Sequence, residues 1–188
     1  MAHVIVITGP SGVGKGTVIR LLRERIPSVR LSISATTRQP RPGERDRVDY
    51  HFLTAEQFDA LVSEAAFAEH ARYAGHQYGT LLSELEREGD GDGVVMLEIE
   101  LQGARQIRES MPEALQVFIA PPSFETLRER LVGRGTDSAQ TIDERLSVAR
   151  DELEAQNEFS EVIVNDRVGD AVDALEALVQ SQLGGAVD

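Results

Sequence analysis

Residues 4–15 read Val-Ile-Val-Ile-Thr-Gly-Pro-Ser-Gly-Val-Gly-Lys, and this stretch decides the class of fold. Its first four residues are apolar and β-branched, which is typical of a strand buried on both faces of a parallel sheet. Three glycines and a proline then interrupt the strand and indicate a loop. Apolar residues at helical spacing follow, so we predict a helix that opens near Lys15 and ends at Pro27.

The order strand, glycine-rich loop, helix is the context in which a Gly-x4-Gly-Lys motif binds phosphate. Backbone N–H groups of such a loop converge on phosphate oxygens, and the helix N-terminus adds the positive end of its dipole. The alternative is a flexible glycine-rich turn with no ligand. Lys15 is the single lysine among 19 basic residues, so we expect it where a compact ammonium is required, on the β- and γ-phosphates. The residues expected at the phosphates are Gly9, Pro10, Ser11, Gly12, Val13, Gly14, Lys15, Gly16 and Thr17.

Gly16 departs from the general motif, which has Ser or Thr after the lysine as a ligand for Mg²⁺. Thr17 places a hydroxyl one residue later, and adenylate kinases have a similar Gly-Lys-Gly-Thr ending. We therefore expect Mg²⁺ to be held mainly by phosphates and water.

The rest of the chain alternates short apolar strands with helical patterns, which predicts an α/β fold with a parallel sheet flanked by helices. Strands are expected at 94–101, 116–120 and 162–164, and helices at 124–132, 142–153 and 172–183. The segment after residue 30 differs, with half-buried strands at 31–34 and 50–53 and a capping box that begins at Thr54. We interpret it as a small mixed α+β insert on the parallel core.

Composition limits the functional classes. The chain has 188 residues and no cysteine, which predicts one domain in a reducing compartment and excludes thiol nucleophiles and cysteine-ligated zinc. Nineteen basic and 32 acidic residues give a net charge of −13, which argues against a nucleic-acid partner. No apolar run approaches the ~20 residues of a membrane span, and no signal peptide is recognisable. We expect a cytoplasmic protein without a membrane partner.

Motifs along the whole chain resemble those of guanylate kinases. They include the phosphate loop, Thr-Thr-Arg-x-Pro-Arg at 36–41, Tyr50-x-Phe52, Tyr78-Gly79-Thr80 and Leu97-Glu98-Ile99. Further matches are Glu69, Gln102-Gly103, residues 119–123, 133–136 and 145–146, and Val164-Asn165-Asp166. The resemblance implies ATP-dependent phosphorylation of GMP, and of dGMP, to the diphosphate, with ATP as donor and Mg²⁺ as cofactor.

The resemblance also implies roles for individual residues. Lys15, Arg134 and Arg145 are the expected catalytic cations, and Arg134 also contacts ATP. The expected GMP contacts are Ser34, Arg38, Arg41, Tyr50, Glu69, Tyr78, Thr80, Glu98 and Arg145. Two arginines on a proline-stiffened loop suit a phosphate dianion, and one carboxylate can accept both adjacent N–H donors of guanine. Without the resemblance, these arginines could equally belong to a solvated turn and Glu69 to the surface.

Two further features need the structure. Glu98 and Glu100, two apart at a predicted strand end, would face one side and are our candidates for Mg²⁺, the alternative being a strand end in solvent. Arg47 stands where relatives usually have glycine, so we expect a local change in the acceptor loop, either a distorted turn or an ordinary backbone conformation. The expected organisation is a core of 1–30, 90–132 and 156–188, an insert of about 31–89 and a lid of about 133–155.

Two other functions remain open at this stage. One is a catalytically weak guanylate-kinase-like interaction module, and the other is a related small-molecule kinase, such as a ribose bisphosphate kinase. A regulatory GTPase fits less well, since its Asn-Lys-x-Asp motif cannot occur in a chain whose one lysine lies in the phosphate loop. The sequence does not decide between a monomer and a homo-oligomer.

Overall fold

The computed structural model describes residues 3–73, 75–86, 93–133 and 139–184, and it contains two β-sheets. The larger is a five-stranded parallel sheet in the order β2-β7-β1-β8-β9. Its strands are β1 (His3–Thr8), β2 (Val29–Leu31), β7 (Val94–Glu98), β8 (Leu115–Ala120) and β9 (Glu161–Val164). The α/β class and the parallel core predicted from the sequence are therefore confirmed.

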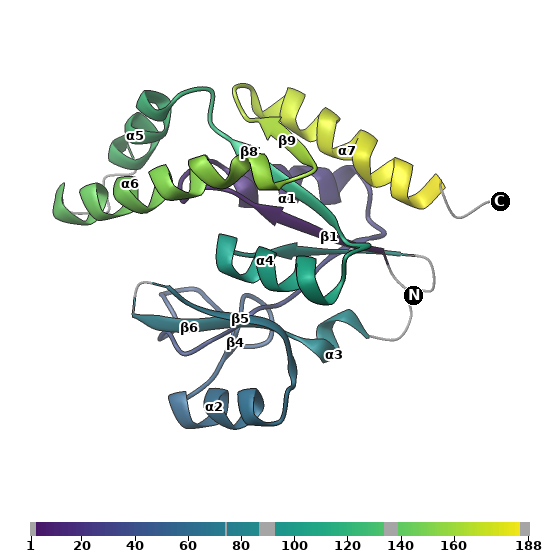
Figure 1. Cartoon of the computed structure of the whole chain (residues 1–188), viewed down its shortest axis with the longest axis vertical. Coiled ribbons are helices and arrows are strands. Elements are labelled where there is room, and N and C mark those ends of the chain that lie inside the picture. Colours follow the sequence, from purple (N-terminus) through teal and green to yellow (C-terminus); the bar gives the residue numbers. More distant parts are fainter. Residues whose placement is uncertain (1–2, 74, 87–92, 134–138, 185–188) are drawn as a thin grey trace.

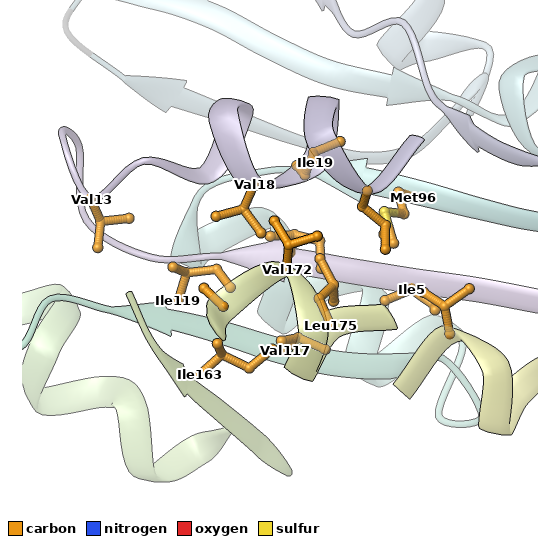
Figure 2. Close-up of a cluster of buried hydrophobic side chains, with 14 of the residues drawn as sticks. Ile5, Val13, Val18, Ile19, Met96, Val117, Ile119, Ile163, Val172 and Leu175 are labelled. Atoms are coloured by element: carbon orange, nitrogen blue, oxygen red, sulfur yellow. The ribbon is translucent and has the colours of Figure 1, made fainter. Parts of the chain in front are cut away.

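Helices cover both faces of the parallel sheet, because successive residues of a strand point to opposite faces and the buried strands are apolar on both. Ile5 and Ile7 point to the face covered by α1 (Lys15–Arg25), α5 (Phe124–Gly133), α6 (Ala139–Glu154) and α7 (Val168–Gly184). Figure 2 shows part of this cluster, with Val18 and Ile19 of α1 and Val172 and Leu175 of α7 beside the strands. Val6 points to the opposite face, against α4 (Leu101–Ser110).

The smaller sheet is built from the segment between β2 and β7. It has the order β4-β3-β6-β5, formed by β3 (Ala35–Thr36), β4 (His51–Phe52), β5 (Phe67–Tyr73) and β6 (His76–Leu81). The predicted capping box is present at the start of α2 (Ala55–Ser63), where Thr54 and Gln57 exchange side-chain-to-backbone hydrogen bonds of 2.8 and 3.2 Å. The short helix α3 (Leu82–Leu85) follows β6, and the 3₁₀ turn η1 (Ala155–Glu158) follows α6.

Helix α4 lies between the two sheets (Figure 1). One side of α4 packs Ala104 and Ile107 into the apolar cluster on the parallel sheet. The other side meets β5, where the Gln106 side chain bonds both backbone groups of His70. The helix therefore sets the spacing between the parallel sheet and the smaller sheet.

Three strand predictions need correction. The pattern at 31–34 is divided between two sheets, since β2 ends at Leu31 on the parallel sheet and β3 begins at Ala35 on the smaller one. The strand expected at 50–53 is limited to the two residues of β4. The strand expected at 94–101 ends at Glu98, because Glu100 caps α4 and its carbonyl accepts the N–H of Ala104.

Strands β5 and β6 and helix α4 were not predicted. The residues of β5, Phe-Ala-Glu-His-Ala-Arg-Tyr, do not alternate cleanly between apolar and polar, so they gave no strand pattern. Gly75, which adopts φ of 80° before β6, was the one turn residue between the two strands. The apolar residues of α4 are few, and Glu-Ile-Glu-Leu at 98–101 imitates strand alternation. Among the described residues, no helix combines the length and the hydropathy that a bilayer crossing requires.

Arg47 adopts φ of 59°, in the left-handed region that glycine occupies without strain. Its N–H donates to the Tyr50 carbonyl at 2.7 Å, so a tight turn precedes Tyr50. The ordinary backbone conformation that we considered for this residue is excluded. The arginine instead takes up the conformation expected of glycine.

Arg47→Gly should raise the free energy of unfolding by up to about 1 kcal/mol, because relief of left-handed strain exceeds the entropy cost of glycine. Urea denaturation would measure the change. Arg45→Gly is the matched control, since Arg45 is exposed in the same loop without positive φ, and that variant should lose stability. Equal losses in both variants would contradict the strain argument.

Candidate active site

A cleft of about 700 Å³ opens at the carboxyl edge of the parallel sheet, between that sheet and the smaller one. Parallel strands end at the same edge, which is where open α/β sheets bind ligands. The predicted site residues that line the cleft are Pro10, Ser11, Gly12, Gly14, Lys15, Gly16, Thr17, Ser34, Arg38, Arg41, Tyr50, Glu69, Tyr78, Glu98, Glu100 and Arg145. Gly9, Val13 and Thr80 adjoin the cleft without lining it, and Arg134 lies outside the described residues.

The phosphate loop connects β1 to α1 and depends on glycine at two close approaches. Gly9 has φ of 146°, and a Cβ there would lie 2.2 Å from the Ile119 carbonyl oxygen. Gly14, the residue that precedes α1, has φ of 102°, and a Cβ there would lie 2.6 Å from Nδ2 of Asn165. The same Nδ2 donates to the Val13 carbonyl at 2.8 Å, so the Asn165 side chain fixes the backbone of the loop at Val13.

Lys15 reaches back over the loop, and its Nζ donates to the Gly9 carbonyl at 2.6 Å. The ammonium therefore lies inside the curve of the loop, beside the first turn of α1. A cation and a helix N-terminus at one point form a site for phosphate oxygens.

Glu98 ends β7 directly opposite the phosphate loop. A Cβ at Gly16 would lie 3.8 Å from Oε2 of Glu98, an ordinary contact distance. The position where the general motif has a metal-binding hydroxyl therefore faces a carboxylate in this chain. Burial raises the pKa of Glu98, and the Lys15 ammonium opposes that shift.

Glu100 and Glu152 form a carboxyl pair next to Glu98. Glu152 comes from α6, is 6% exposed, and bonds both the Glu100 side chain and the Ser11 backbone. Burial and the Glu100 carboxyl raise the pKa of Glu152, because two ionised carboxylates cannot share a buried hydrogen bond. Sequence reasoning missed Glu152, which reads as one of many charges on an amphipathic helix.

The acceptor loop, residues 37–50 between β3 and β4, holds Arg38 in a fixed orientation. Its guanidinium bonds both carboxylate oxygens of Glu44 at 2.9 Å and lies 5.2 Å from the centre of the Tyr50 ring. Arg38 is the main cause that lowers the pKa of Glu44. The rings of Tyr50 and Tyr78 meet edge-on at 6.4 Å between centroids, so both line the cleft beside Arg38.

Glu69 extends from β5 into the cleft. It is 4% exposed, and its Oε1 accepts the Thr80 hydroxyl at 2.8 Å. Burial raises the pKa of Glu69 to about 7, and the Thr80 hydrogen bond opposes this shift by favouring the ionised form. Thr80 is itself fully buried, so its hydroxyl meets the cleft through Glu69.

Another buried carboxylate, Glu84 on α3, lies where the smaller sheet joins the parallel sheet. Its Oε2 accepts the backbone N–H of Ile33 at 3.1 Å, and its Oε1 lies 3.1 Å from Nε2 of His51. Ile33 and His51 are the chain neighbours of Ser34 and Tyr50, so Glu84 fixes the backbone that carries two cleft residues. No motif in the sequence indicated this role.

Thr80→Val should raise the pKa of Glu69 above about 7, because the variant removes the hydroxyl that stabilises the carboxylate. Carbon-13 NMR of the glutamate carboxyl groups would follow the titration. Thr36→Val is the control, since Thr36 is equally buried in the same sheet but its hydroxyl donates to the Gln77 carbonyl. An unchanged pKa of Glu69 in Thr80→Val would show that the hydrogen bond does not stabilise the ionised carboxylate.

Comparisons with known proteins agree on one family. The sequence model of the family described as Guanylate kinase matches residues 1–182. The guanylate kinase of Parasynechococcus marenigrum (strain WH8102) is 52% identical over 95% of this chain and 98% of its own length. That of Mycobacterium tuberculosis (strain CDC 1551 / Oshkosh) is 46% identical over 99% of this chain and 90% of its own length.

A solved structure gives the same result for the fold. The crystal structure of guanylate kinase from Anaplasma phagocytophilum superposes with a TM-score of 0.78 at 30% sequence identity. The superposition covers 96% of this chain and 86% of that one. A phosphate loop, a buried carboxylate and an arginine–tyrosine cluster thus share one cleft in a chain similar to these enzymes over most of its length. The chain belongs to the guanylate kinase family.

Proposed function

We propose that this protein is an enzyme that transfers the γ-phosphoryl group of ATP to GMP, giving ADP and GDP. The observation that carries the proposal is the single cleft that holds Lys15 in a phosphate loop on one wall and Glu69 on the other. Family membership supports it, because relatives with about half of their residues in common bear the name guanylate kinase. ATP is the phosphoryl donor of this family.

The donor side is the phosphate loop. Its backbone N–H groups and the N-terminus of α1 would hold the ATP phosphates, with the Lys15 ammonium offsetting the charge that gathers on the transferred group. Arg145 of α6 lines the cleft and would add positive charge to both nucleotides. We assign the same role to Arg134 from the resemblance alone.

The acceptor side is the smaller sheet and its loop. Arg38 and Arg41 would bind the GMP phosphate, helped by the hydroxyls of Tyr50 and Tyr78. Glu69 would accept N1–H and the 2-amino group of guanine, a pair of donors that adenine lacks. Ser34 would bind the base directly, and Thr80 would act on it through Glu69. No general base is needed, since the attacking phosphate oxygen is already anionic.

Mg²⁺ fits the chemistry of this cleft. Glu98 and Glu100 supply the hard oxygen ligands that Mg²⁺ prefers, beside the loop that would hold the phosphates. Phosphate oxygens and water would supply the other ligands, since Mg²⁺ usually keeps several waters in nucleotide sites. Held at these residues, Mg²⁺ would supply positive charge that offsets the negative charge of the phosphates.

We also propose the division of labour expected from the sequence, with a core, a GMP-binding insert of about 31–89 and a lid of about 133–155. Two features support it. Residues between β2 and β7 form their own sheet, and α6 brings Arg145 to the cleft from within the lid segment. A closing lid would exclude water, which would otherwise accept the phosphoryl group.

The reaction itself is tested by measuring ADP release with ATP and Mg²⁺, comparing GMP, dGMP, AMP, UMP, CMP and ribose bisphosphate as acceptors. We expect turnover with GMP and dGMP alone. Turnover with ribose bisphosphate instead would favour the small-molecule kinase. GMP binding without turnover would favour the interaction module.

Lys15→Ala should lower kcat by at least ~10²-fold, because it removes a preorganised charge from the transferring phosphoryl group. Rates at saturating ATP and GMP would measure the loss. Thermal unfolding should change little, since the hydrogen bonds of the ammonium go to the Gly9 and Pro10 carbonyls of the loop itself. Activity within a few-fold of the parent would refute the assignment of the phosphate loop.

Arg38→Ala should raise the KM for GMP by ~10-fold or more while leaving the KM for ATP within a factor of about two, because a bidentate phosphate contact is lost. Arg45→Ala is the matched control, since Arg45 is exposed on the same loop and does not line the cleft. Equal effects of the two substitutions would mean that only the net charge of the loop matters.

A further inference from the structure

The first turn of α4 passes unusually close to the carboxylate proposed to recognise guanine. Gly103, the third residue of α4, is buried. A Cβ at this position would lie 2.2 Å from Oε2 and 2.9 Å from Cδ of Glu69. These distances are far inside van der Waals contact, so the carboxylate occupies the space that any other residue at 103 would fill.

The other side of the same carboxylate is also occupied. Oε1 of Glu69 accepts the Thr80 hydroxyl at 2.8 Å, and Glu69 is 4% exposed. Thr80 on one side and Gly103 on the other thus confine the carboxylate to one orientation. That orientation places Glu69 on the wall of the cleft.

Helix α4 cannot simply move away from β5 to make room. Gln106, one turn after Gly103, accepts the backbone N–H of His70 at 3.1 Å and donates to the His70 carbonyl at 2.7 Å. Ala104 and Ile107 on the other side of the helix are fully buried against the parallel sheet. The group free to shift in response to a side chain at 103 is therefore the end of Glu69.

We propose that Gly103 is a specificity-determining positioning residue, whose missing side chain leaves room for the Glu69 carboxylate to face the guanine base. This inference rests on the proposed role of Glu69 in GMP recognition. A methyl group at 103 pushes the carboxylate out of line with N1–H and the 2-amino group, while the phosphate loop and the acceptor arginines stay in place. Base recognition is then lost before the fold is.

The test compares Gly103→Ala with Gly169→Ala. Both glycines lie in the first turn of a helix, but a Cβ at Gly169 would meet nothing within 4 Å. In Gly103→Ala we expect the KM for GMP to rise ~10-fold or more, with the KM for ATP changed less than about twofold. Gly169→Ala should leave both values unchanged. Equal kinetics in the two variants, or parallel increases in both KM values for Gly103→Ala, would overturn the proposal.

A second readout separates positioning from general damage. IMP lacks the 2-amino group of GMP, so the preference for GMP over IMP reports how well the carboxylate is aligned. Gly103→Ala should reduce this preference ~5-fold or more, because one of the two donor contacts no longer discriminates. A loss of activity that is equal for GMP and IMP would mean that residue 103 serves only the structure.

A double variant guards against misfolding. Glu69→Asp shortens the side chain by one methylene and withdraws it from residue 103. Gly103→Ala should therefore lower the free energy of unfolding much less in the Glu69→Asp background than in the parent. If Gly103→Ala alone fails to fold, the double variant should still fold. Strict additivity of the two substitutions, or failure of the double variant to fold, would contradict the steric conflict.

Glu69→Gln distinguishes failure of this inference from failure of the proposed function. The amide cannot accept two N–H donors with both of its ends, so Glu69→Gln should raise the KM for GMP strongly. An unchanged KM in Glu69→Gln would refute the role of Glu69 itself. A raised KM in Glu69→Gln together with parent-like Gly103→Ala would refute only the inference about Gly103.

Discussion

The parallel pairing of β1 with β7 is the constraint on which the rest of the site depends. Ile7 lies opposite Glu98 in this register, so the phosphate loop that follows β1 and the carboxylates that follow β7 leave the sheet at one edge. An antiparallel partner would send the following loop to the far edge. The direction of these two strands is therefore enough to place the loop that carries Lys15 opposite Glu98 and Glu100, whatever the detailed conformation of the loops.

Buried carboxylates dominate the electrostatics of this cleft. Burial raises the pKa values of Glu69, Glu98 and Glu152, since each loses water around its ionised form. For Glu69 the folded protein binds a proton more tightly than the unfolded chain does, so its contribution to stability falls as pH rises from the ordinary value of 4.5 to about 7. The cleft thus holds acceptor groups at a cost in stability, which the N–H donors of a bound base or a bound metal cation can offset.

Helix α4 connects the packing of the molecule with this chemistry. It lies between the two sheets (Figure 1), follows its N-cap Glu100 on the cleft, and holds β5 through Gln106. Because one short helix sets the spacing between Glu98 on the parallel sheet and Glu69 on the smaller sheet, small changes in its first turn act directly on the cleft. The walls of the cleft that carry Glu98 and Glu69 are positioned through the same helix.

The sequence by itself determined the phosphate loop, the parallel core with the helices α1, α5, α6 and α7 on one of its faces, and the capping box of α2. These features depend on local chemistry: β-branched apolar runs, helical spacing, and glycines where a Cβ cannot fit. Only the tertiary structure decided that the Thr80 hydroxyl bonds Glu69, that Glu152 meets Ser11 and Glu100, and that Gly103 lies against Glu69. Each of these contacts joins segments far apart in the chain, and their geometry follows from how the two sheets pack around α4, which no local pattern of residues encodes.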